Sequence, residues 1–362
     1  MTDESYIKLA IEIARKGTGY VSPNPLVGCV IVKNNSIIGA GYHEKYGENH
    51  AEVNAINTAK ESVEGSTLYV NLEPCSHTGK TPPCVNKIIE NKIRRVVIGT
   101  LDMNPLVCGK GVRKLKAAGI EVKVGVLEKE CMELNKFFFK YIAGNLPYVS
   151  LKAAQTLDGK IADCSGDSKW ITTVHARRYV HALRSKYDAV LVGSGTVVKD
   201  DPSLTVRYTE GRNPYRVLVD SKLALSTKHK LFKNNQDNKF IILTSKRSAE
   251  KKRKISTLTS MGIKVLFVKE TREGRLNLKD ALSVLAKNKV ASVLVEGGSE
   301  VFTSFIRTNL FDDILLFISP KMLGCGLPVI HEIGIKSIKK ALKLKIDNFE
   351  KIGDDLFVEL VK

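Results

Sequence analysis

The sequence predicts an α/β protein built from two domains in succession. A chain of 362 residues is long enough to bury two separate cores. Strand and helix patterns alternate over residues 27–126 and again over 148–318. A polar break, Gly144-Asn145-Leu146-Pro147, separates the two patterns. We therefore place the domains at 1–145 and 146–362, with no internal repeat relating them.

The first half begins with a helix over residues 4–17, whose apolar residues recur on one face. A rigid loop, Ser22-Pro23-Asn24-Pro25, leads into a hairpin of two strands, 27–33 and 36–42. The elements expected after it are helix 50–60, strand 67–71, helix 84–91, strand 94–100, helix 109–118, strand 121–126 and helix 127–140. Their alternation predicts a largely parallel sheet flanked by helices.

The second half repeats this kind of alternation. The elements expected there are strand 148–154, helix 174–186, strands 188–193, 215–220 and 239–244, helix 247–260, strand 263–268, helix 278–288, strand 291–296, helix 299–309 and strand 313–318. The stretch after Pro320 carries less recognisable chemistry.

Composition and charge exclude several classes of protein. The net charge is +19, of which residues 146–362 hold +15. Lysine runs such as Lys246 to Lys254 are typical of a solvated helix face, so phosphorylated small ligands explain the charge more simply than a nucleic acid. No apolar stretch approaches the ~20 residues that span a bilayer. An acidic, then amphipathic N-terminus and seven irregularly spaced cysteines favour a cytoplasmic protein with reduced thiols over a secreted disulfide framework.

Three short motifs in the first half predict a metal centre. His50-Ala-Glu52 is followed by Pro74-Cys75 and Pro83-Cys84, so one imidazole and two thiolates offer three zinc ligands. A catalytic zinc leaves its fourth position open for water, whose pKa falls to about 7, and Glu52 could move the proton of that water. The pattern is the zinc-deaminase signature H-x-E with P-C-x-x-C, except that eight residues separate the two cysteines.

A structural zinc is the alternative, and it would need a fourth protein ligand. His43 and His77 are the close candidates, but we interpret them as groups that face a substrate. Cys84 is expected at the N-terminus of a helix, where the helix dipole and the metal both favour its thiolate. A metal-stabilised scaffold without catalytic activity is the corresponding functional alternative.

Three further places carry possible chemistry in the second half. Glu296-Gly297-Gly298-Ser299 lies at a strand end before a helix, where backbone amides can approach a pyrophosphate. Arg207, after Asp200-Asp201-Pro202, is either a phosphate ligand or a surface arginine. Thr244-Ser245-Lys246-Arg247 suits either the 2′-phosphate of NADPH or a helix cap with solvated charges.

The first half resembles the deaminase half of the bifunctional riboflavin-biosynthesis deaminase/reductase family. The motifs that carry the resemblance are Ser22–Pro25, His50–Glu52, Glu73–Cys84 and Asp102–Pro105, although family members often have His where Ser22 stands. The resemblance implies a cytidine-deaminase-like α/β/α fold, one Zn²⁺ held by His50, Cys75 and Cys84, and Glu52 as the catalytic proton donor and acceptor. It also implies a substrate site formed by Asn24, His43, His77, Lys80 and Asn104.

The second half resembles the reductase half of the same family, on Leu157–Lys160, Gly166–Ile171, Asp200–Arg207 and Glu296–Gly298. The resemblance implies a dihydrofolate-reductase-like α/β fold that binds NADPH. The implied cofactor residues are Ala154, Trp170, Thr196, Asp200, Ser221, Gly298, Ser299, Glu300, Val301, Phe302, Thr303 and Ser304. The implied substrate residues are Lys152, Ser168, Arg184, Leu204, Arg207 and Glu296. For Trp170, a role in the core remains as open as packing against the cofactor.

The resemblance implies two successive reactions on phosphoribosylaminopyrimidine substrates. The first removes the 2-amino group of 2,5-diamino-6-(5-phosphoribosylamino)pyrimidin-4-one by hydrolysis. The second reduces the ribosyl group of the resulting uracil derivative to ribityl with NADPH. A homo-oligomer, dimer or tetramer, without nucleic acid or membrane partners is implied as well. The main alternative function is that of a tRNA or DNA base deaminase whose basic second half binds the polynucleotide.

Overall fold

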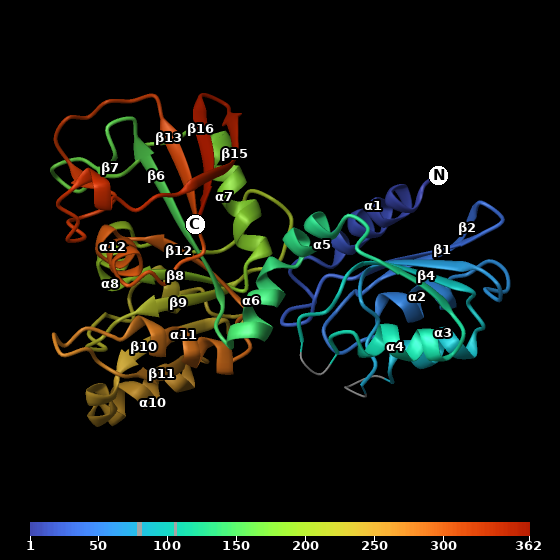
Figure 1. The fold of residues 1–362 in the computed structure, drawn as a ribbon. Coiled ribbons are helices and arrows are strands. Elements are labelled where there is room, and N and C mark those ends of the chain that lie inside the picture. Colours follow the sequence, from blue (N-terminus) through green and yellow to red (C-terminus); the bar gives the residue numbers. More distant parts are fainter. Residues whose placement is uncertain (78–81, 105–106) are drawn as a thin grey trace. The chain divides into compact units, whose positions relative to one another are not determined.

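The computed structural model describes residues 1–77, 82–104 and 107–362, which divide into two compact units, Met1–Asn145 and Leu146–Lys362 (Figure 1). Lys80, assigned above to a substrate site, lies outside the described residues. Each unit is an α/β structure around its own sheet.

Unit 1 contains a five-stranded sheet in the order β2-β1-β3-β4-β5. Only β3, β4 and β5 run parallel, because β1 pairs antiparallel with both β2 and β3. The prediction of a largely parallel sheet is therefore correct for β3, β4 and β5 and wrong for β1 and β2. The strands are β1 Gly28–Lys33, β2 Ser36–Tyr42, β3 Thr67–Leu72, β4 Arg95–Thr100 and β5 Glu121–Val124, and the helices are α1 Asp3–Ala14, α2 Ala51–Asn57, α3 Cys84–Glu90, α4 Lys110–Ala117, α5 Glu128–Leu134 and α6 Lys136–Gly144.

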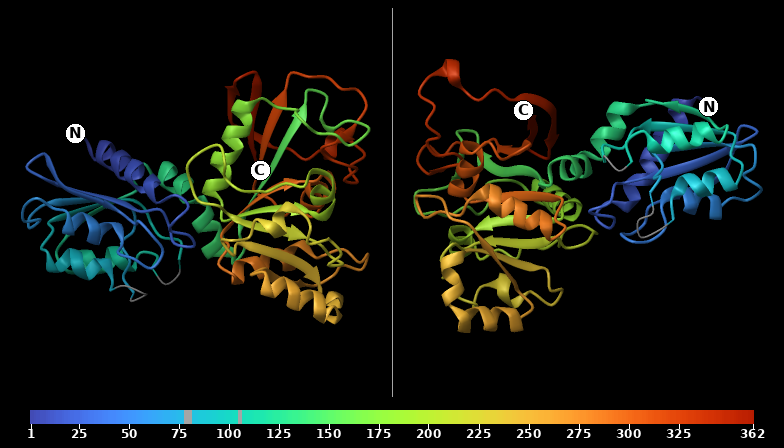
Figure 2. Two further views of the ribbon diagram at one scale, coloured as in Figure 1. Left: turned by 180° about the vertical axis from the view of Figure 1, so that it is seen from behind. Right: turned by 60° about the horizontal axis from the view of Figure 1, so that its bottom comes forward.

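Helices cover both faces of this sheet, as the views in Figures 1 and 2 show for α1 and α5 on one face and α2, α3 and α4 on the other. Alternate residues of β1 explain the two layers, since successive side chains of a strand point to opposite faces. Cys29 and Ile31 belong to a cluster with Val85 and Ile88 of α3, and Val30 packs with α1 on the opposite face. The unit is thus a three-layer α/β/α sandwich.

Two helix boundaries in unit 1 differ from the sequence prediction. The helix expected over 127–140 is interrupted at Asn135, which is buried and turns its side chain to the loop before β1. Its Oδ1 accepts the Leu26 N–H at 2.7 Å and its Nδ2 donates to the Leu26 carbonyl at 3.0 Å. His50 has extended backbone angles and caps α2 instead of lying in its first turn.

Unit 2 contains a nine-stranded sheet in the order β11-β10-β9-β8-β12-β6-β13-β16-β15. The strands from β11 to β13 run parallel, and a C-terminal antiparallel hairpin, β16 and β15, extends that sheet. The strands are β6 Tyr148–Thr156, β7 Lys160–Ala162, β8 Ala189–Gly193, β9 Tyr215–Val219, β10 Phe240–Ser245, β11 Lys264–Val268, β12 Ser292–Gly297, β13 Asp313–Ser319, β14 Leu327–Pro328, β15 Lys345–Ile352 and β16 Asp355–Val361. The helices are α7 Val174–Lys186, α8 Ser194–Asp200, α9 Lys230–Lys233, α10 Lys252–Ser260, α11 Leu278–Lys287 and α12 Ser299–Arg307.

The core of unit 2 lies between this sheet and its helices. Leu282 and Leu285 of α11 and Phe302 and Phe305 of α12 pack with alternate residues of the parallel strands in one cluster. On the opposite face, Tyr179 of α7 contacts Phe317 of β13 and Phe357 of β16, with ring centroids 5.8 and 5.1 Å apart. The C-terminal hairpin thus contributes to the core, which the sequence analysis did not foresee.

Cys164 and Cys325 form a disulfide in unit 2, across 161 residues of sequence. The bond joins the loop after β7 to the loop before β14, and β7 and β14 pair antiparallel beside it. This pairing differs from the expectation that all seven cysteines are reduced. The other five, including Cys75 and Cys84, are free thiols.

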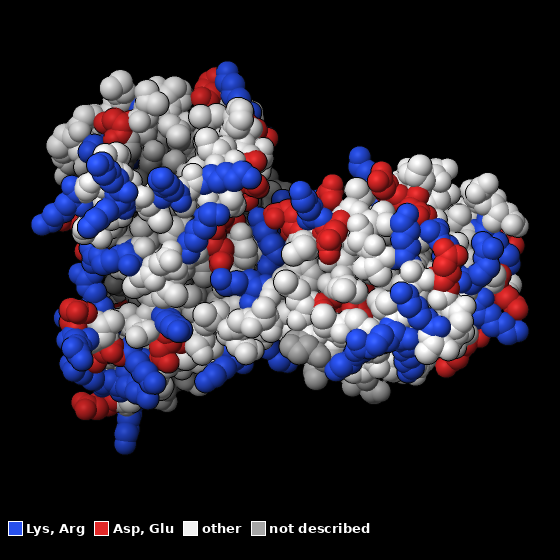
Figure 3. All heavy atoms as spheres, in the orientation of Figure 1, with Lys and Arg blue, Asp and Glu red and all other residues white. Residues whose placement is uncertain are grey.

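Lys and Arg side chains are distributed over the faces of the units seen in Figure 3, with acidic side chains interspersed among them. Two lysines of the run Lys246–Lys254 donate hydrogen bonds to backbone carbonyls of the loop after β9. Lys251 Nζ donates to the Lys222 carbonyl and Lys254 Nζ to the Leu225 carbonyl, each at 2.8 Å. Among the residues that the structure describes, no helix is long and apolar enough to cross a membrane.

Candidate functional site

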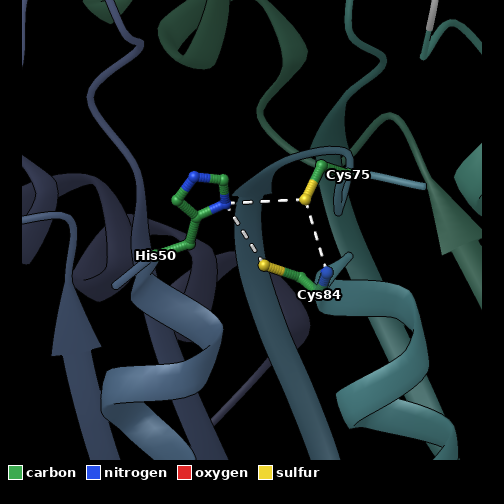
Figure 4. A group of neighbouring side chains, drawn as sticks. All are labelled: His50, Cys75 and Cys84. Atoms are coloured by element: carbon green, nitrogen blue, oxygen red, sulfur yellow. Dashed lines mark hydrogen bonds between the residues drawn. The ribbon is translucent and has the colours of Figure 1, made fainter. Parts of the chain in front are cut away.

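Three side chains from separate elements of unit 1 converge on one point (Figure 4). His50 caps α2, Cys75 follows β3, and Cys84 is the first residue of α3. The Sγ atoms of Cys75 and Cys84 lie 3.5 and 3.3 Å from His50 Nδ1, and the Cys84 backbone N–H donates to Cys75 Sγ at 3.3 Å. The three ligand atoms all lie within 4.8 Å of one another.

This donor set fits a zinc ion. Zn²⁺ binds imidazole nitrogen and thiolate sulfur at about 2.0–2.3 Å in tetrahedral geometry, which brings its ligand atoms to roughly 3.5–4 Å from one another. Hydrogen bonds from Cys84 and His50 hold the pKa of the Cys75 thiol well below its usual range, so that this sulfur is a ready ligand. Within the described ranges, no fourth His, Cys, Asp or Glu joins the group, as a catalytic site requires.

Glu52 lies in the first turn of α2, two residues after His50, and is 3% exposed. Its Oε2 is buried and has no hydrogen-bond partner among the described residues. Burial raises the pKa of the Glu52 carboxyl, and the nearby His50 imidazole opposes this effect. Leaving a buried polar atom unpaired costs about 1–3 kcal/mol, so a ligand that pairs with Oε2 would recover that energy.

His43 stands beside this centre without joining the donor set. Its ring centroid lies 5.2 Å from that of His50. His43 Nδ1 lies 3.0 Å from the Asn49 carbonyl oxygen, which can only accept a hydrogen bond, so Nδ1 carries the proton. Nε2 then accepts from Asn24 Nδ2 at 3.1 Å. Because burial lowers the pKa of His43, the ring stays neutral and fixes the orientation of the Asn24 amide.

Glu73 connects the metal centre to the loop that carries Asn104. The Glu73 carboxylate is buried and accepts the backbone N–H groups of Asp102, Gly109 and Val112 at 3.3, 2.9 and 3.2 Å. Asp102 Oδ1 in turn accepts the Asn104 N–H at 2.8 Å. The segment that includes Asn104 is thereby fixed relative to Cys75. His77, two residues after Cys75, has an exposed side chain.

Unit 2 contains a cavity of about 1080 Å³ at the carboxyl ends of its parallel strands. Its walls come from β6, β8 and β12, from α7, α8 and α12, and from the loops after β7 and before α11. The carboxyl ends of parallel strands are the usual ligand position in open α/β sheets. The volume exceeds the roughly 300–1,000 Å³ typical of small-molecule sites, which leaves room for two ligands.

Most residues that the sequence analysis assigned to unit 2 line this cavity, but Thr303 and Leu204 do not. Thr303 is buried, where its Oγ1 donates to the Ser299 carbonyl and accepts the His331 N–H. Leu204 is buried as well. The assigned residues that do line the cavity are Lys152, Ala154, Ser168, Trp170, Arg184, Thr196, Asp200, Arg207, Ser221, Glu296, Gly298, Ser299, Glu300, Val301, Phe302 and Ser304.

Charged side chains gather at one end of the cavity. Arg184 forms a two-pronged ion pair with Glu296, with Nε and Nη2 at 2.6 and 2.8 Å from its carboxylate oxygens. Burial would raise the pKa of the Glu296 carboxyl, but the Arg184 guanidinium outweighs it and lowers the pKa to about 2. Burial lowers the pKa of the Lys152 amine, which Glu296 partly opposes. Because Glu296 can neutralise only one of the two cations Arg184 and Lys152, this end of the cavity attracts anions.

Trp170 belongs to the cavity wall and not to the core. Its side chain is 60% exposed, and the Arg177 guanidinium carbon stacks 4.1 Å from its ring centroid. Ser168, on the same loop, donates to Asp200 Oδ1 at 3.4 Å. The motif Thr244–Arg247 does not line the cavity, and Arg247 pairs with Glu270 at 2.9 Å instead. Ser245 precedes a short 3-10 helix, Lys246–Glu250, but its side chain makes no capping hydrogen bond, and Thr244 Oγ1 donates to the Ser221 carbonyl at 3.2 Å.

Sequence reasoning missed several cavity residues. His181 and Arg177 lie on α7 with Arg184, and Thr271 and residues 273–279, which lead into the start of α11, form part of the wall. For His181 a signal existed, since a residue three positions before Arg184 shares its helix face. The segment before α11 has no motif or periodicity that could have revealed it.

Two family models together match nearly the whole chain. Residues 1–100 match the cytidine and deoxycytidylate deaminase zinc-binding region, and residues 147–358 match the RibD C-terminal domain. The riboflavin biosynthesis protein RibD of Aquifex aeolicus is 48% identical over 358 residues, covering 98% of this chain and 97% of that protein. Its Escherichia coli K12 counterpart is 37% identical and covers 100% of both chains.

Solved structures agree with these matches. A diaminohydroxyphosphoribosylaminopyrimidine deaminase/5-amino-6-(5-phosphoribosylamino)uracil reductase from Thermotoga maritima superposes with a TM-score of 0.88 at 43% identity. RibD from Acinetobacter baumannii superposes with a TM-score of 0.89 at 35% identity. Each comparison covers 99% of this chain and 98% of the other.

Proposed function

Because the chain belongs to the RibD family of bifunctional riboflavin-biosynthesis deaminase/reductases, we propose that unit 1 carries the deaminase and unit 2 the reductase. The chain is an enzyme of riboflavin biosynthesis, and its N-terminal fold is cytidine-deaminase-like. The observation that supports the assignment of the deaminase site is the convergence of His50, Cys75 and Cys84 beside Glu52, whose buried Oε2 has no partner among the described residues. The rival base deaminase of tRNA or DNA is set aside, because the family match extends over both halves.

The proposed deaminase substrate is 2,5-diamino-6-(5-phosphoribosylamino)pyrimidin-4-one, with one Zn²⁺ held by His50, Cys75 and Cys84. When bound, zinc lowers the pKa of a water molecule to about 7 and so supplies a nucleophile near neutral pH. Glu52 takes up the proton of the attacking water and delivers it to the pyrimidine ring nitrogen. It then transfers the proton of the newly added hydroxyl group to the amino group, which leaves as ammonia as the carbonyl forms. Its burial suits this role, since burial raises the pKa of the carboxyl and so makes it a better proton acceptor than an exposed glutamate.

The proposed contacts to this substrate come from the residues around the metal centre. The neutral His43 ring orients the Asn24 amide, and Glu73 fixes the loop that presents Asn104. His77 and Lys80 complete the set carried over from the family motifs. Amide and cationic side chains of this kind suit a pyrimidine bearing a ribose phosphate.

The reductase unit takes a nucleotide cofactor, which we propose is NADPH, bound in the cavity of unit 2. NADPH supplies the hydride that converts the ribosyl group of 5-amino-6-(5-phosphoribosylamino)uracil to ribityl. Trp170, Thr196, Asp200 and the start of α12 would hold the cofactor, since they line the cavity together with Ala154 and Ser221. Lys152, Arg184, Arg207 and Glu296 at the charged end, with Ser168, would hold the phosphoribosyl substrate.

A cytoplasmic homo-oligomer, dimer or tetramer, is also proposed. Family membership supports the location, because the substrates are phosphorylated metabolites. Exposed apolar side chains on the edge strand β15 support self-association, since Ile346 and Phe349 are 58% and 69% exposed there.

The decisive experiment incubates the purified protein with the diamino phosphoribosylaminopyrimidine, with and without NADPH, and follows ammonia and NADPH separately. Ammonia release without NADPH, followed by NADPH consumption when it is added, is the expected result. Absence of ammonia from the zinc-loaded protein would overturn the deaminase assignment. NADPH that is never consumed, even with the deaminated product supplied directly, would overturn the reductase assignment.

A further inference from the structure

His181 faces the charged end of the unit 2 cavity and has no role in the function proposed above. It lies on α7, three residues before Arg184, and is 4% exposed. The ring of Tyr208, which also lines the cavity, packs edge-on against it with centroids 4.7 Å apart. A buried imidazole between cationic side chains at a ligand cavity is a candidate for a specific task.

The hydrogen bond that His181 accepts shows the protonation state of its ring and the residue that it holds. The backbone N–H of Arg207 donates to His181 Nδ1 at 2.9 Å, so Nδ1 must carry a lone pair and the ring must be neutral. Burial and the adjacent cations Arg184 and Arg207 lower the pKa of His181 to about 4, which keeps Nδ1 an acceptor at neutral pH.

The segment that bears Arg207 has no helix or strand of its own and depends on such bonds. Three successive residues are each held by a hydrogen bond to a side chain, two of them from α7 and one from Asn213, further along the same segment. Arg184 Nη1 donates to the Thr205 carbonyl at 3.1 Å, and Asn213 Oδ1 accepts the Val206 N–H at 2.9 Å. His181 holds the third residue, Arg207, whose exposed side chain lines the cavity.

We propose that His181 is a positioning residue of the reductase, which holds the Arg207 backbone so that its guanidinium meets the phosphate of the phosphoribosyl substrate. The proposal rests on the function proposed above, because it takes Arg207 to be a phosphate ligand. Arg207 needs this support, since a guanidinium binds phosphate strongly only when its planar fork is correctly oriented. His181 thus acts on the substrate through Arg207.

Three substitutions separate the two ring nitrogens. His181→Asn places an amide oxygen near the position of Nδ1 and keeps an acceptor for Arg207. His181→Gln places its amide near Nε2 and loses that acceptor. His181→Phe loses both ring nitrogens but keeps an aromatic ring against Tyr208. His175→Asn is the matched control, because His175 is an exposed histidine of the same helix that does not line the cavity.

The measurements are kcat and KM for the phosphoribosyl substrate and for NADPH, equilibrium binding of ribose 5-phosphate, and deaminase turnover. Urea unfolding followed by Trp170 fluorescence is the control for the folding of unit 2. We expect His181→Phe and His181→Gln to raise KM for the phosphoribosyl substrate and the Kd of ribose 5-phosphate roughly tenfold, the cost of about one hydrogen bond. His181→Asn should stay within about threefold of the wild type. KM for NADPH and the turnover of the deaminase should be unchanged in all three variants.

A double-mutant cycle with Arg207→Ala completes the test. If His181 acts through Arg207, His181→Phe adds no further loss once Arg207 is removed. Additive losses, unchanged binding in His181→Phe, or recovery by His181→Gln instead of His181→Asn would each overturn the proposal. A wild-type protein that neither binds ribose 5-phosphate nor reduces the substrate would instead refute the function on which the proposal rests.

Discussion

Glu52 is the residue on which the proposed deaminase mechanism depends most directly. Its Oε2 is buried without a partner among the described residues, so nothing in that part of the chain competes with a substrate for it. We predict that Glu52→Gln keeps zinc but lowers deaminase kcat by about 10²–10⁴-fold, since an amide of equal size cannot transfer the proton. Zinc content by atomic absorption and ammonia release check the two halves of this prediction. Turnover close to the wild-type rate would remove Glu52 from its role.

Glu296 links the stability of unit 2 to pH. Its carboxyl has a pKa of about 2 in the folded chain against an ordinary value of 4.5, because Arg184 stabilises the carboxylate by more than burial destabilises it. A depressed folded pKa stabilises the protein above pH 4.5, and the stabilisation is lost as pH falls from about 4.5 to 2. The full contribution is on the order of 3 kcal/mol.

Urea unfolding followed by the fluorescence of Trp170, the only tryptophan in the chain, reports on unit 2. We expect Glu296→Gln to lower the free energy of unfolding at pH 7, and the difference from the wild type to shrink as pH falls below 4.5. Glu250→Gln, which alters an exposed carboxylate in the same unit, is the control. A difference that stays constant from pH 7 to pH 3 would contradict the assignment of the effect to this ion pair.

At the scale of elements, the disulfide joins two segments that border the cavity. Cys164 and Cys325 connect the loop after β7 to the loop before β14, and both neighbourhoods contribute cavity residues such as Gly166 and Leu327. A bond that closes a loop of 161 residues removes much chain entropy from the unfolded state. The chain-entropy treatment gives about 5 kcal/mol for such a loop, and measured values are commonly about 2–4 kcal/mol.

We therefore predict that dithiothreitol lowers the free energy of unfolding of unit 2 by about 2–4 kcal/mol. The wild type and the Cys164→Ser/Cys325→Ser variant are compared by Trp170 fluorescence, with and without the reductant. The variant should match the reduced wild type and not respond to dithiothreitol. Equal stabilities of the oxidised and reduced wild type would show that the bond does not contribute.

The elements also show where sequence reasoning works. Helices and strands with regular apolar spacing, such as α7, were predicted to the residue or nearly so, because burial of one face imposes that spacing. The strand β15 was missed because seven of its eight residues are exposed, so no alternation marks it. The break at Asn135 was missed because it depends on a partner, Leu26, that is 109 residues distant in sequence.

The residues of the candidate sites also divide into those that the sequence could predict and those that it could not. The convergence of His50, Cys75 and Cys84 could be predicted because metal chemistry restricts both residue type and spacing to a few patterns. His181 could not, since its partner is the backbone of Arg207 in a segment without regular structure. Of the cofactor residues taken from family motifs, Thr303 is not in the cavity wall because it holds the residues after β14 instead.

At the scale of the whole molecule, the two units have separate cores and separate sites. Among residues 1–77, 82–104 and 107–362, the apolar clusters of unit 1 and that of unit 2 share no buried residue, and each candidate site is built from residues of one unit. Loss of the metal should therefore affect unit 1 alone. We predict that Cys84→Ser loses zinc and ammonia release, whereas NADPH-dependent reduction of the deaminated product and the unfolding of unit 2 seen by Trp170 stay at wild-type levels. Cys108→Ser, which alters an exposed free thiol of the same unit, should retain both activities. A parallel loss of reduction in Cys84→Ser would show that the units depend on each other, since zinc has no proposed ligand in unit 2 to account for it.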